Sequence, residues 1–181
     1  MSNATAEMTM TPEQAMNVRD AALFTLGTSQ WFLDKLTGDL SGDEWVHQPC
    51  NGANHALWNI GHLAASDKSF LDMLGGSTSA VPESYNELFG MGSEPKGALS
   101  AYPAPAEVVK VFQTVRGELI AHAKAMTGAQ LAAATPNEQM AQVAPTLAQF
   151  LNFMVLHDST HAGQICIARK SLGKSHVLGG E

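Results

Sequence analysis

One stretch near the C-terminus, residues 150–173, has the residue spacing of a long amphipathic helix. His157 and His161 lie on its inward stripe, four residues apart, so their side chains lie one above the other on one face. Two imidazoles on such a face either bind a metal ion together or find separate hydrogen-bond partners in the core. The apolar or small residues of the stripe are Phe150, Met154, Ile165, Ala168 and Leu172.

Three further stretches predict long helices with recognisable ends. The first follows a capping-box spelling, Thr11 with Gln14, and Pro12 suits its first helical position. Thr146 with Gln149 is the same spelling at the start of the C-terminal helix. The predicted helices span residues 12–36, 54–74, 105–126 and 147–172. Core candidates in the first are Leu23, Leu26, Trp31 and Leu33.

The connection between the second and third helices, residues 76–104, is rich in Gly, Pro and Ser. A short helix at 84–89 fits within it. This connection is far longer than a turn between antiparallel neighbours, so it predicts a crossover that leaves the second and third helices parallel. We therefore expect an all-α four-helix bundle over residues 11–174, with a disordered tail at 1–10 and a C-terminal tail at 175–181.

Composition and charge exclude several classes of protein. Hydrophobic residues make up 45% of the chain and charged residues 15%, which is typical of a globular domain. The net charge is −7 and there is no basic run, so nucleic acid and anionic membranes are poor partners. No apolar run approaches the roughly 20 residues that span a bilayer. Residues 1–10 are polar and have no basic start, so we expect no signal peptide. With only Cys50 and Cys166, we expect a cytoplasmic protein.

His62, near the middle of the second helix, is the candidate for a third metal ligand. A lone core histidine is more often structural, but the facing pair His157 and His161 reverses that balance. A catalytic zinc-type site uses three protein ligands and an open position. The neighbours of His62 on that helix are small and leave room for a pocket. Candidate pocket or supporting residues are Trp58, Ser66, Ser69 and Gln164.

The second helix and the remaining helical histidines carry further expectations. The helix containing His62 is apolar on two sides, which predicts one side toward the bundle core and the other toward a partner subunit. His122 also lies on an apolar stripe, but it is near the end of its helix and at a different height. We therefore expect His122 to be a satisfied histidine outside the site, and His55 to be an exposed or capping residue.

The pattern Trp58-x-x-x-His62-Leu63, with His157-x-x-x-His161-x-Gly163-Gln164, resembles the DinB/YfiT-like superfamily over about residues 12–173. The resemblance implies an up-down-down-up four-helix bundle and a divalent-metal site of three histidines. It also implies a homodimer. Characterised members use their metal to activate a small thiol such as mycothiol or bacillithiol, and others are described as hydrolases.

Three hypotheses follow. The first is an enzyme that holds zinc or nickel and activates a low-molecular-weight thiol or water for transfer or hydrolysis of a small-molecule substrate. The second is a non-catalytic metal-binding or dimeric interaction module. The third is a purely structural role, with each histidine satisfied by hydrogen bonds.

Overall fold

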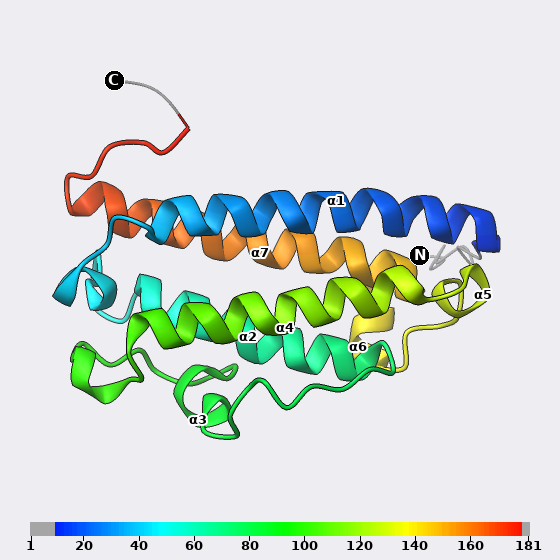
Figure 1. Cartoon of the computed structure of the whole chain (residues 1–181), viewed down its shortest axis with the longest axis horizontal. Helices are drawn as coiled ribbons and strands as arrows, with labels where there is room; N and C mark the ends of the chain where they lie inside the picture. Colours follow the sequence, from blue (N-terminus) through cyan, green and yellow to red (C-terminus); the bar gives the residue numbers. More distant parts are fainter. Residues whose placement is uncertain (1–9, 179–181) are drawn as a thin grey trace, which may run out of the picture.

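The computed structural model describes residues 10–178, and the regular elements of this part are helical (Figure 1). The predicted all-α class is confirmed over these residues. Four helices are long and the remainder are short. The elements are α1 (Pro12–Thr37), η1 (Gly42–Val46), α2 (Ala56–Met73), α3 (Tyr85–Phe89), η2 (Leu99–Ala101), α4 (Pro105–Ala125), α5 (Gly128–Leu131), α6 (Glu138–Ala141) and α7 (Leu147–Ser171).

Local sequence signals determine where the outer helices begin. Gln14 N–H donates to Thr11 Oγ1 over 3.2 Å, and Thr11 N–H donates to Gln14 Oε1 over 2.9 Å. Thr146 and Gln149 form the same reciprocal pair at the start of α7, over 3.0 and 3.3 Å. Both predicted capping boxes are confirmed, and the long helices end within two residues of their predicted bounds.

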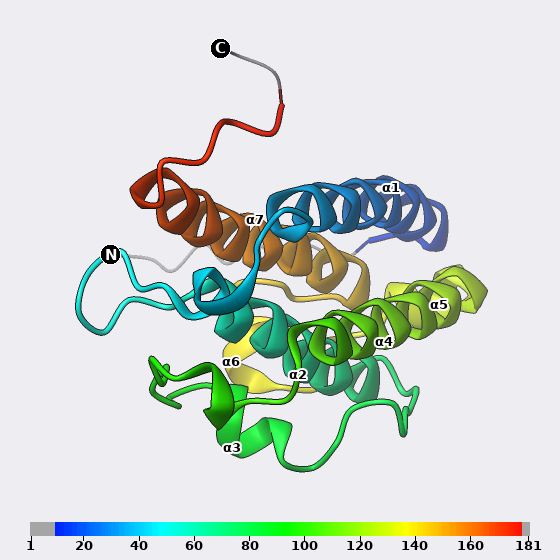
Figure 2. The ribbon, with the colours of Figure 1, turned by 60° about the vertical axis from the view of Figure 1, so that its left-hand side comes forward.

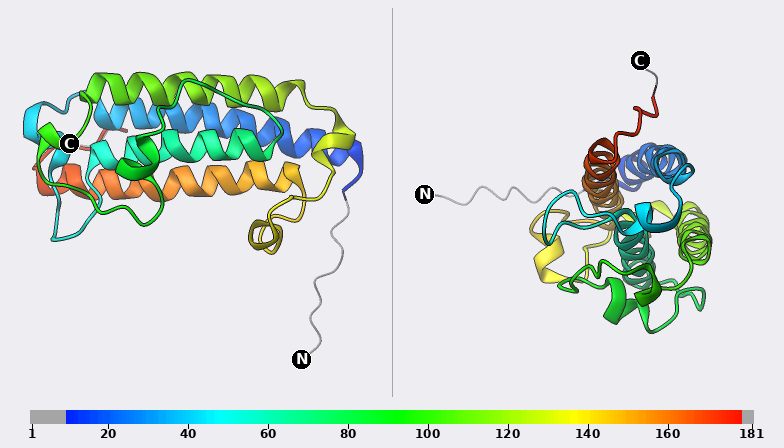
Figure 3. Two further views of the ribbon diagram at one scale, coloured as in Figure 1. Left: turned by 90° about the horizontal axis from the view of Figure 1, so that it is seen from below. Right: turned by 90° about the vertical axis from the view of Figure 1, so that its left-hand side faces the viewer.

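The long helices pack in pairs, α1 along α7 and α2 along α4, and α2 also contacts α7. The end-on view in Figure 3 shows the four grouped around a shared interior. The colours of Figure 1 run in one direction along α1 and α7 and in the other along α2 and α4. Because α2 and α7 contact each other, the predicted site residues near their centres lie within reach of one another.

The chain itself covers the second apolar side of α2. Figure 2 shows α3 and its flanking loops lying against α2 on the side away from α1. Phe89 of α3 is fully buried, and a Cβ at Gly61 would lie only 2.4 Å from its ring. Close packing of α3 therefore requires glycine at this position. The expectation that a partner subunit covers this side was wrong, because the long crossover folds back onto it.

A buried ion triad crosses the centre of the bundle. The guanidinium of Arg116 on α4 donates to Asp67 on α2 and to Asp158 on α7, with shortest distances of 2.6 Å to each. Ser29 on α1 donates to Asp158 over 2.8 Å, so the triad joins all four long helices. Burial raises the pKa of Asp67 to about 6, despite the opposing charge of Arg116.

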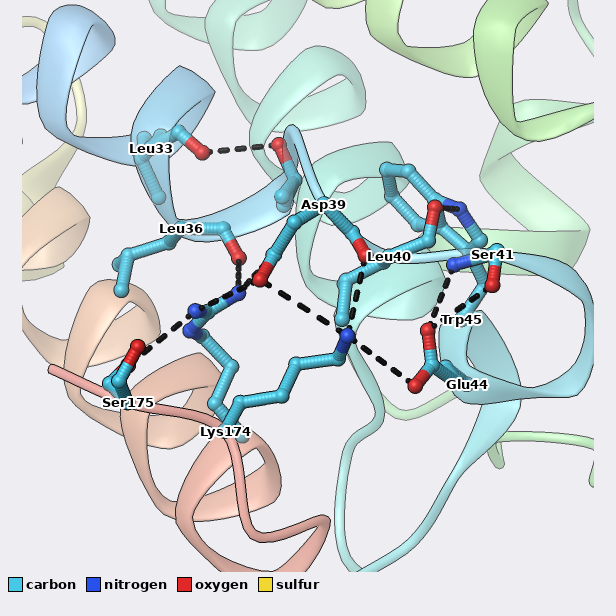
Figure 4. Close-up of polar contacts among 11 residues, drawn as sticks. Leu33, Leu36, Asp39, Leu40, Ser41, Glu44, Trp45, Lys174 and Ser175 are labelled. Atoms are coloured by element: carbon cyan, nitrogen blue, oxygen red, sulfur yellow. Dashed lines mark hydrogen bonds and ion pairs between the residues drawn. The ribbon is translucent and has the colours of Figure 1, made fainter. Parts of the chain in front are cut away.

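A second polar network holds one end of the bundle together (Figure 4). Arg169 of α7 donates to the Leu36 carbonyl over 2.7 Å and pairs with the Asp39 carboxylate. Lys174 Nζ donates to the Asp39 carbonyl over 3.0 Å and lies 3.1 Å from a Glu44 oxygen. The chain just after α7 is therefore tied to the loop between α1 and η1.

The surface of α1 and the two chain ends differ in part from what the sequence predicts. Trp31 was predicted to be a core residue, and this was wrong: its side chain is 50% exposed. It shares an outward face with Phe24, seven residues earlier, while Leu26 and Leu33 occupy the buried face. The predicted tail at 1–10 lies outside the described residues except for Met10, which packs against the core. Residues 179–181 of the predicted C-terminal tail also lie outside them.

Across residues 10–178, none of the helices combines the length and apolar character needed to cross a membrane.

Candidate metal centre

Three histidines from two helices converge at one point. His62 comes from α2, and His157 and His161 come from α7. The Nε2 atom of His157 lies 3.3 Å from that of His62 and 3.2 Å from that of His161. Nitrogen ligands bound to one zinc ion at the usual bond length, with tetrahedral angles, would be about 3.3–3.4 Å apart. The spacing therefore fits a shared divalent cation.

The hydrogen bond made by the other ring nitrogen shows which atom of His62 is free to ligate. His62 Nδ1 lies 2.7 Å from the carbonyl oxygen of Phe89. A carbonyl only accepts, so Nδ1 carries the proton and donates it. Nε2 of His62 is therefore the unprotonated nitrogen, and its lone pair points toward the other two rings.

His161 is held in the same tautomer by a side chain. Its Nδ1 lies 2.7 Å from Asn59 Oδ1. Asn59 Nδ2 donates to the backbone carbonyl of His55 over 3.1 Å, which fixes the orientation of the amide. His161 Nδ1 therefore donates its proton to Asn59, and its Nε2 lone pair also points into the cluster.

His157 lies between these two lone pairs and differs from both neighbours. Its Nδ1 is buried and has no hydrogen-bond partner. A neutral His157 can direct a single N–H along a straight line to only one of the two facing nitrogens. Independent hydrogen bonds therefore leave this cluster incompletely satisfied, whereas one cation at the point of convergence would use all three nitrogens.

The electrostatics keep the three rings neutral. Burial, together with the smaller effect of the neighbouring imidazoles, lowers the pKa of His161 to about 3 and that of His157 to about 4. Burial also lowers the pKa of His62, against the bond to Phe89. Neutral imidazole is the form that binds metal ions, so the rings are ready to ligate at neutral pH.

Apolar and hydroxyl groups surround the cluster. The indole of Trp58 stacks on the His62 ring, with centroids 4.7 Å apart and planes 8° from parallel. Phe70 meets His157 edge-on, with ring centroids 5.5 Å apart. Ser66 Oγ lies 3.4 Å from His62 Nε2, on the side of the ring that faces the other two histidines. Trp58 and Ser66 therefore lie beside the candidate ligand His62.

Two predicted supporting residues have other roles. Ser69 Oγ donates to the Ala65 carbonyl of its own helix over 3.3 Å. Gln164 Oε1 accepts from Asn54 Nδ2 over 3.1 Å. Gln164 also lines a cavity of about 360 Å³ beside Cys50. Gln164 was expected to reach the pocket or an imidazole; its side chain instead bonds to Asn54, which precedes the N-cap of α2.

Sequence reasoning missed one residue of the site and underestimated another. Asn59 could have been found from the sequence, because it is a polar residue within the largely apolar segment 56–65 of α2. In the structure it is fully buried. His55 was expected to be exposed or capping, and it is a fully buried N-cap that accepts from Trp58 N–H over 3.0 Å. His122 donates to the Leu74 carbonyl over 3.0 Å and is not part of the cluster, as predicted.

Comparison with known proteins supports one family. The sequence profile of the DinB superfamily matches residues 32–165, which is well over half of the chain and includes all three clustered histidines. No curated protein matches the chain closely enough to count as a relative. With this match, the all-helical fold and the three-histidine cluster, the chain belongs to the DinB superfamily.

Proposed function

We propose that this DinB-superfamily protein binds a divalent metal ion through His62, His157 and His161. The observation that carries the proposal is that the Nε2 lone pairs of His62 and His161 already point toward a common centre. Phe89 and Asn59 each accept the Nδ1 proton of one histidine, so two Nε2 atoms face the third at 3.2–3.3 Å. Imidazole ligands suit zinc, nickel, copper and iron, and of these we expect zinc or nickel.

The arrangement of the long helices supports an up-down-down-up bundle as the scaffold of this site. In that arrangement α1 and α7 are parallel neighbours, as are α2 and α4, and the long connection after α2 is the crossover. The pairing of α1 with α7 and of α2 with α4 is consistent with it. The ligands would then come from the middle of α2 and α7, which contact each other, and not from helix ends that fray.

The function that this site supports best is a metal-dependent enzyme that activates a small thiol or water for transfer or hydrolysis. Three protein ligands leave a coordination position for a substrate or solvent atom. A bound divalent ion acts there as a Lewis acid and lowers the pKa of a thiol or water ligand. Trp58 and Phe70 would shield the site, and Ser66 would offer a hydroxyl to an incoming group.

A second candidate is a non-catalytic metal-stabilised module that acts as a homodimer. Large apolar side chains on α1 and α7 favour it, because they face outward. Phe24 is 78% exposed, and Leu156 and Ile167 are each more than 60% exposed. Contiguous patches of such side chains mark surfaces that meet another protein.

Metal content tests the shared part of both candidates. We expect protein purified without an affinity tag, then incubated with zinc, to hold about one ion per chain by elemental analysis. His157→Ala should lose most of this binding, because it removes the central ligand. His122→Ala is the matched control, since it removes a histidine outside the cluster and should bind as wild type. Wild-type protein that takes up neither zinc nor nickel would contradict the proposal.

Catalysis is tested separately. A panel of low-molecular-weight thiols with electrophilic acceptors, and of simple ester and amide substrates, should reveal turnover that needs the metal. We expect His157→Ala to lose this turnover and His122→Ala to keep it. Metal binding without turnover on any of these substrates would favour the dimeric module, and turnover that survives His157→Ala would place the reaction elsewhere.

A further inference from the structure

Asn59 is a fully buried residue of α2, and its side-chain amide faces His161 of α7. It has no contact with the point where the three histidines meet, yet it makes one of the shortest polar contacts of the site. Its Oδ1 lies 2.7 Å from His161 Nδ1. Its Nδ2 donates to two backbone carbonyls, those of His55 at 3.1 Å and Asn54 at 3.4 Å.

The two carbonyls fix which end of the amide faces His161. If the amide were reversed, Oδ1 would face two carbonyl oxygens and Nδ2 would lose both acceptors. Such an arrangement leaves several buried polar groups unsatisfied, which destabilises the folded protein. The observed orientation is therefore strongly preferred, and it presents an acceptor, never a donor, to His161 Nδ1.

The support for this orientation extends to the start of α2. The carbonyl that holds Asn59 belongs to His55, the N-cap residue of the helix. The His55 ring accepts from Trp58 N–H and donates to the Lys96 carbonyl over 3.1 Å, so the N-cap is held on both sides. The position of Asn59 is therefore determined by the fold before any ion arrives.

We infer that Asn59 is a positioning residue for the proposed metal centre: it holds His161 in the Nδ1-protonated tautomer, with Nε2 free to ligate. The inference rests on the proposed function for its link to metal. Groups that accept from a ligand histidine fix its ring and its tautomer, and their loss typically costs 10–100-fold in metal affinity. A neutral amide does so without placing a further charge in the buried site.

Two variants at this position separate positioning from simple packing. Asn59→Leu keeps the approximate volume and removes the acceptor. Asn59→Asp keeps an oxygen acceptor for His161, but its second oxygen faces the carbonyls of His55 and Asn54, so we expect it to be less stable than wild type. Thr37→Val is the matched control for stability. Like Asn59, Thr37 is buried and donates to the carbonyl four residues earlier, here that of Leu33, over 2.8 Å. Thr37 lies at the end of α1, which contributes none of the three histidines.

The test has two readouts. Nitrogen-15 NMR of the imidazoles in metal-free protein reports the tautomer of His161, and competition with a chromophoric chelator reports zinc affinity. We expect wild-type His161 to carry its proton on Nδ1. Asn59→Leu should show mixed tautomers and bind zinc about 10–100-fold more weakly. Asn59→Asp should stay closer to wild type than Asn59→Leu, and Thr37→Val should lose thermal stability with unchanged zinc affinity.

The inference is overturned if wild-type His161 carries its proton on Nε2, or if Asn59→Leu keeps both the wild-type tautomer and the wild-type affinity. If Asn59→Leu does not fold, the wild-type tautomer and the Asn59→Asp affinity decide instead. An Asn59→Asp protein with a mixed His161 tautomer and a large loss of affinity would then count against it. Because the tautomer is read without metal, a wild-type protein that binds no zinc refutes the proposed function but leaves this readout intact.

Discussion

The three clustered imidazoles differ in what their outer nitrogens, the Nδ1 atoms, contact. A backbone carbonyl holds His62, a side-chain amide holds His161, and the outer nitrogen of His157 has no partner. All three rings share one property, a pKa lowered chiefly by burial. Protons should therefore compete with a metal ion only in acid, and much less than they would at exposed histidines.

This property predicts the pH dependence of zinc binding. An exposed histidine, with a pKa near 6.5, is largely protonated at pH 5.5. In this site the pKa is about 4 for His157 and about 3 for His161, so both stay neutral at pH 5.5. We expect zinc affinity, measured by calorimetry, to change less than about threefold between pH 7 and 5.5 and to fall steeply near pH 4. A tenfold loss already at pH 6 would contradict the assigned environment.

At the scale of elements, the start of α2 depends on a neutral histidine. Burial lowers the pKa of His55 to about 4. The folded pKa is below the unfolded value near 6.5, so the unfolded chain binds more protons between these values. The free energy of unfolding should therefore fall as the pH drops from 7 to 5, with a contribution from His55 of about 2 kcal/mol.

His55→Asn tests this contribution. Asparagine is a good N-cap residue and does not titrate in this range. We expect the variant to be less stable at pH 7, because it loses the bond to the Lys96 carbonyl, but to lose less stability on going to pH 5 than wild type. Urea denaturation of metal-free protein at both pH values gives the difference, since the clustered histidines contribute equally to both proteins. An identical loss in the two proteins would rule out a neutral, buried His55.

At the scale of the whole molecule, Arg116 links the long helices through two buried carboxylates. Removing only the arginine, as in Arg116→Met, would leave Asp67 and Asp158 facing each other without a cation. We expect this to cost about 3–5 kcal/mol, and the protein should recover part of the loss at pH 5, where Asp67 takes up a proton. Denaturation curves at pH 7 and 5 measure both effects.

A combined variant serves as the control for this triad. Replacing Asp67, Arg116 and Asp158 together by apolar residues of similar size removes every buried charge at once. We expect it to be more stable than Arg116→Met alone, because no unpaired charge remains in the core. A triple variant as unstable as the single one would show that packing, and not charge, sets the cost.

Much of the fold could be predicted from local signals. The capping boxes at Thr11 and Thr146 and the helical spacing of apolar residues placed the long helices within two residues of their bounds. Trp31 could not be placed in this way, because the first helix has more apolar positions than its buried face can hold. Which of them faces the core depends on how α1 is rotated against α7.

For the candidate site, the sequence by itself determined the pair on α7, because positions four apart share one face of any helix. It also singled out His62 as a third candidate from its apolar and small surroundings. Only the tertiary structure decided that His62 meets that pair, that Asn59 and Phe89 hold the outer nitrogens, and that Gln164 turns to Asn54 instead. These contacts join residues about 27 to 110 positions apart, and their geometry depends on how α2, α3 and α7 pack, which no local pattern encodes.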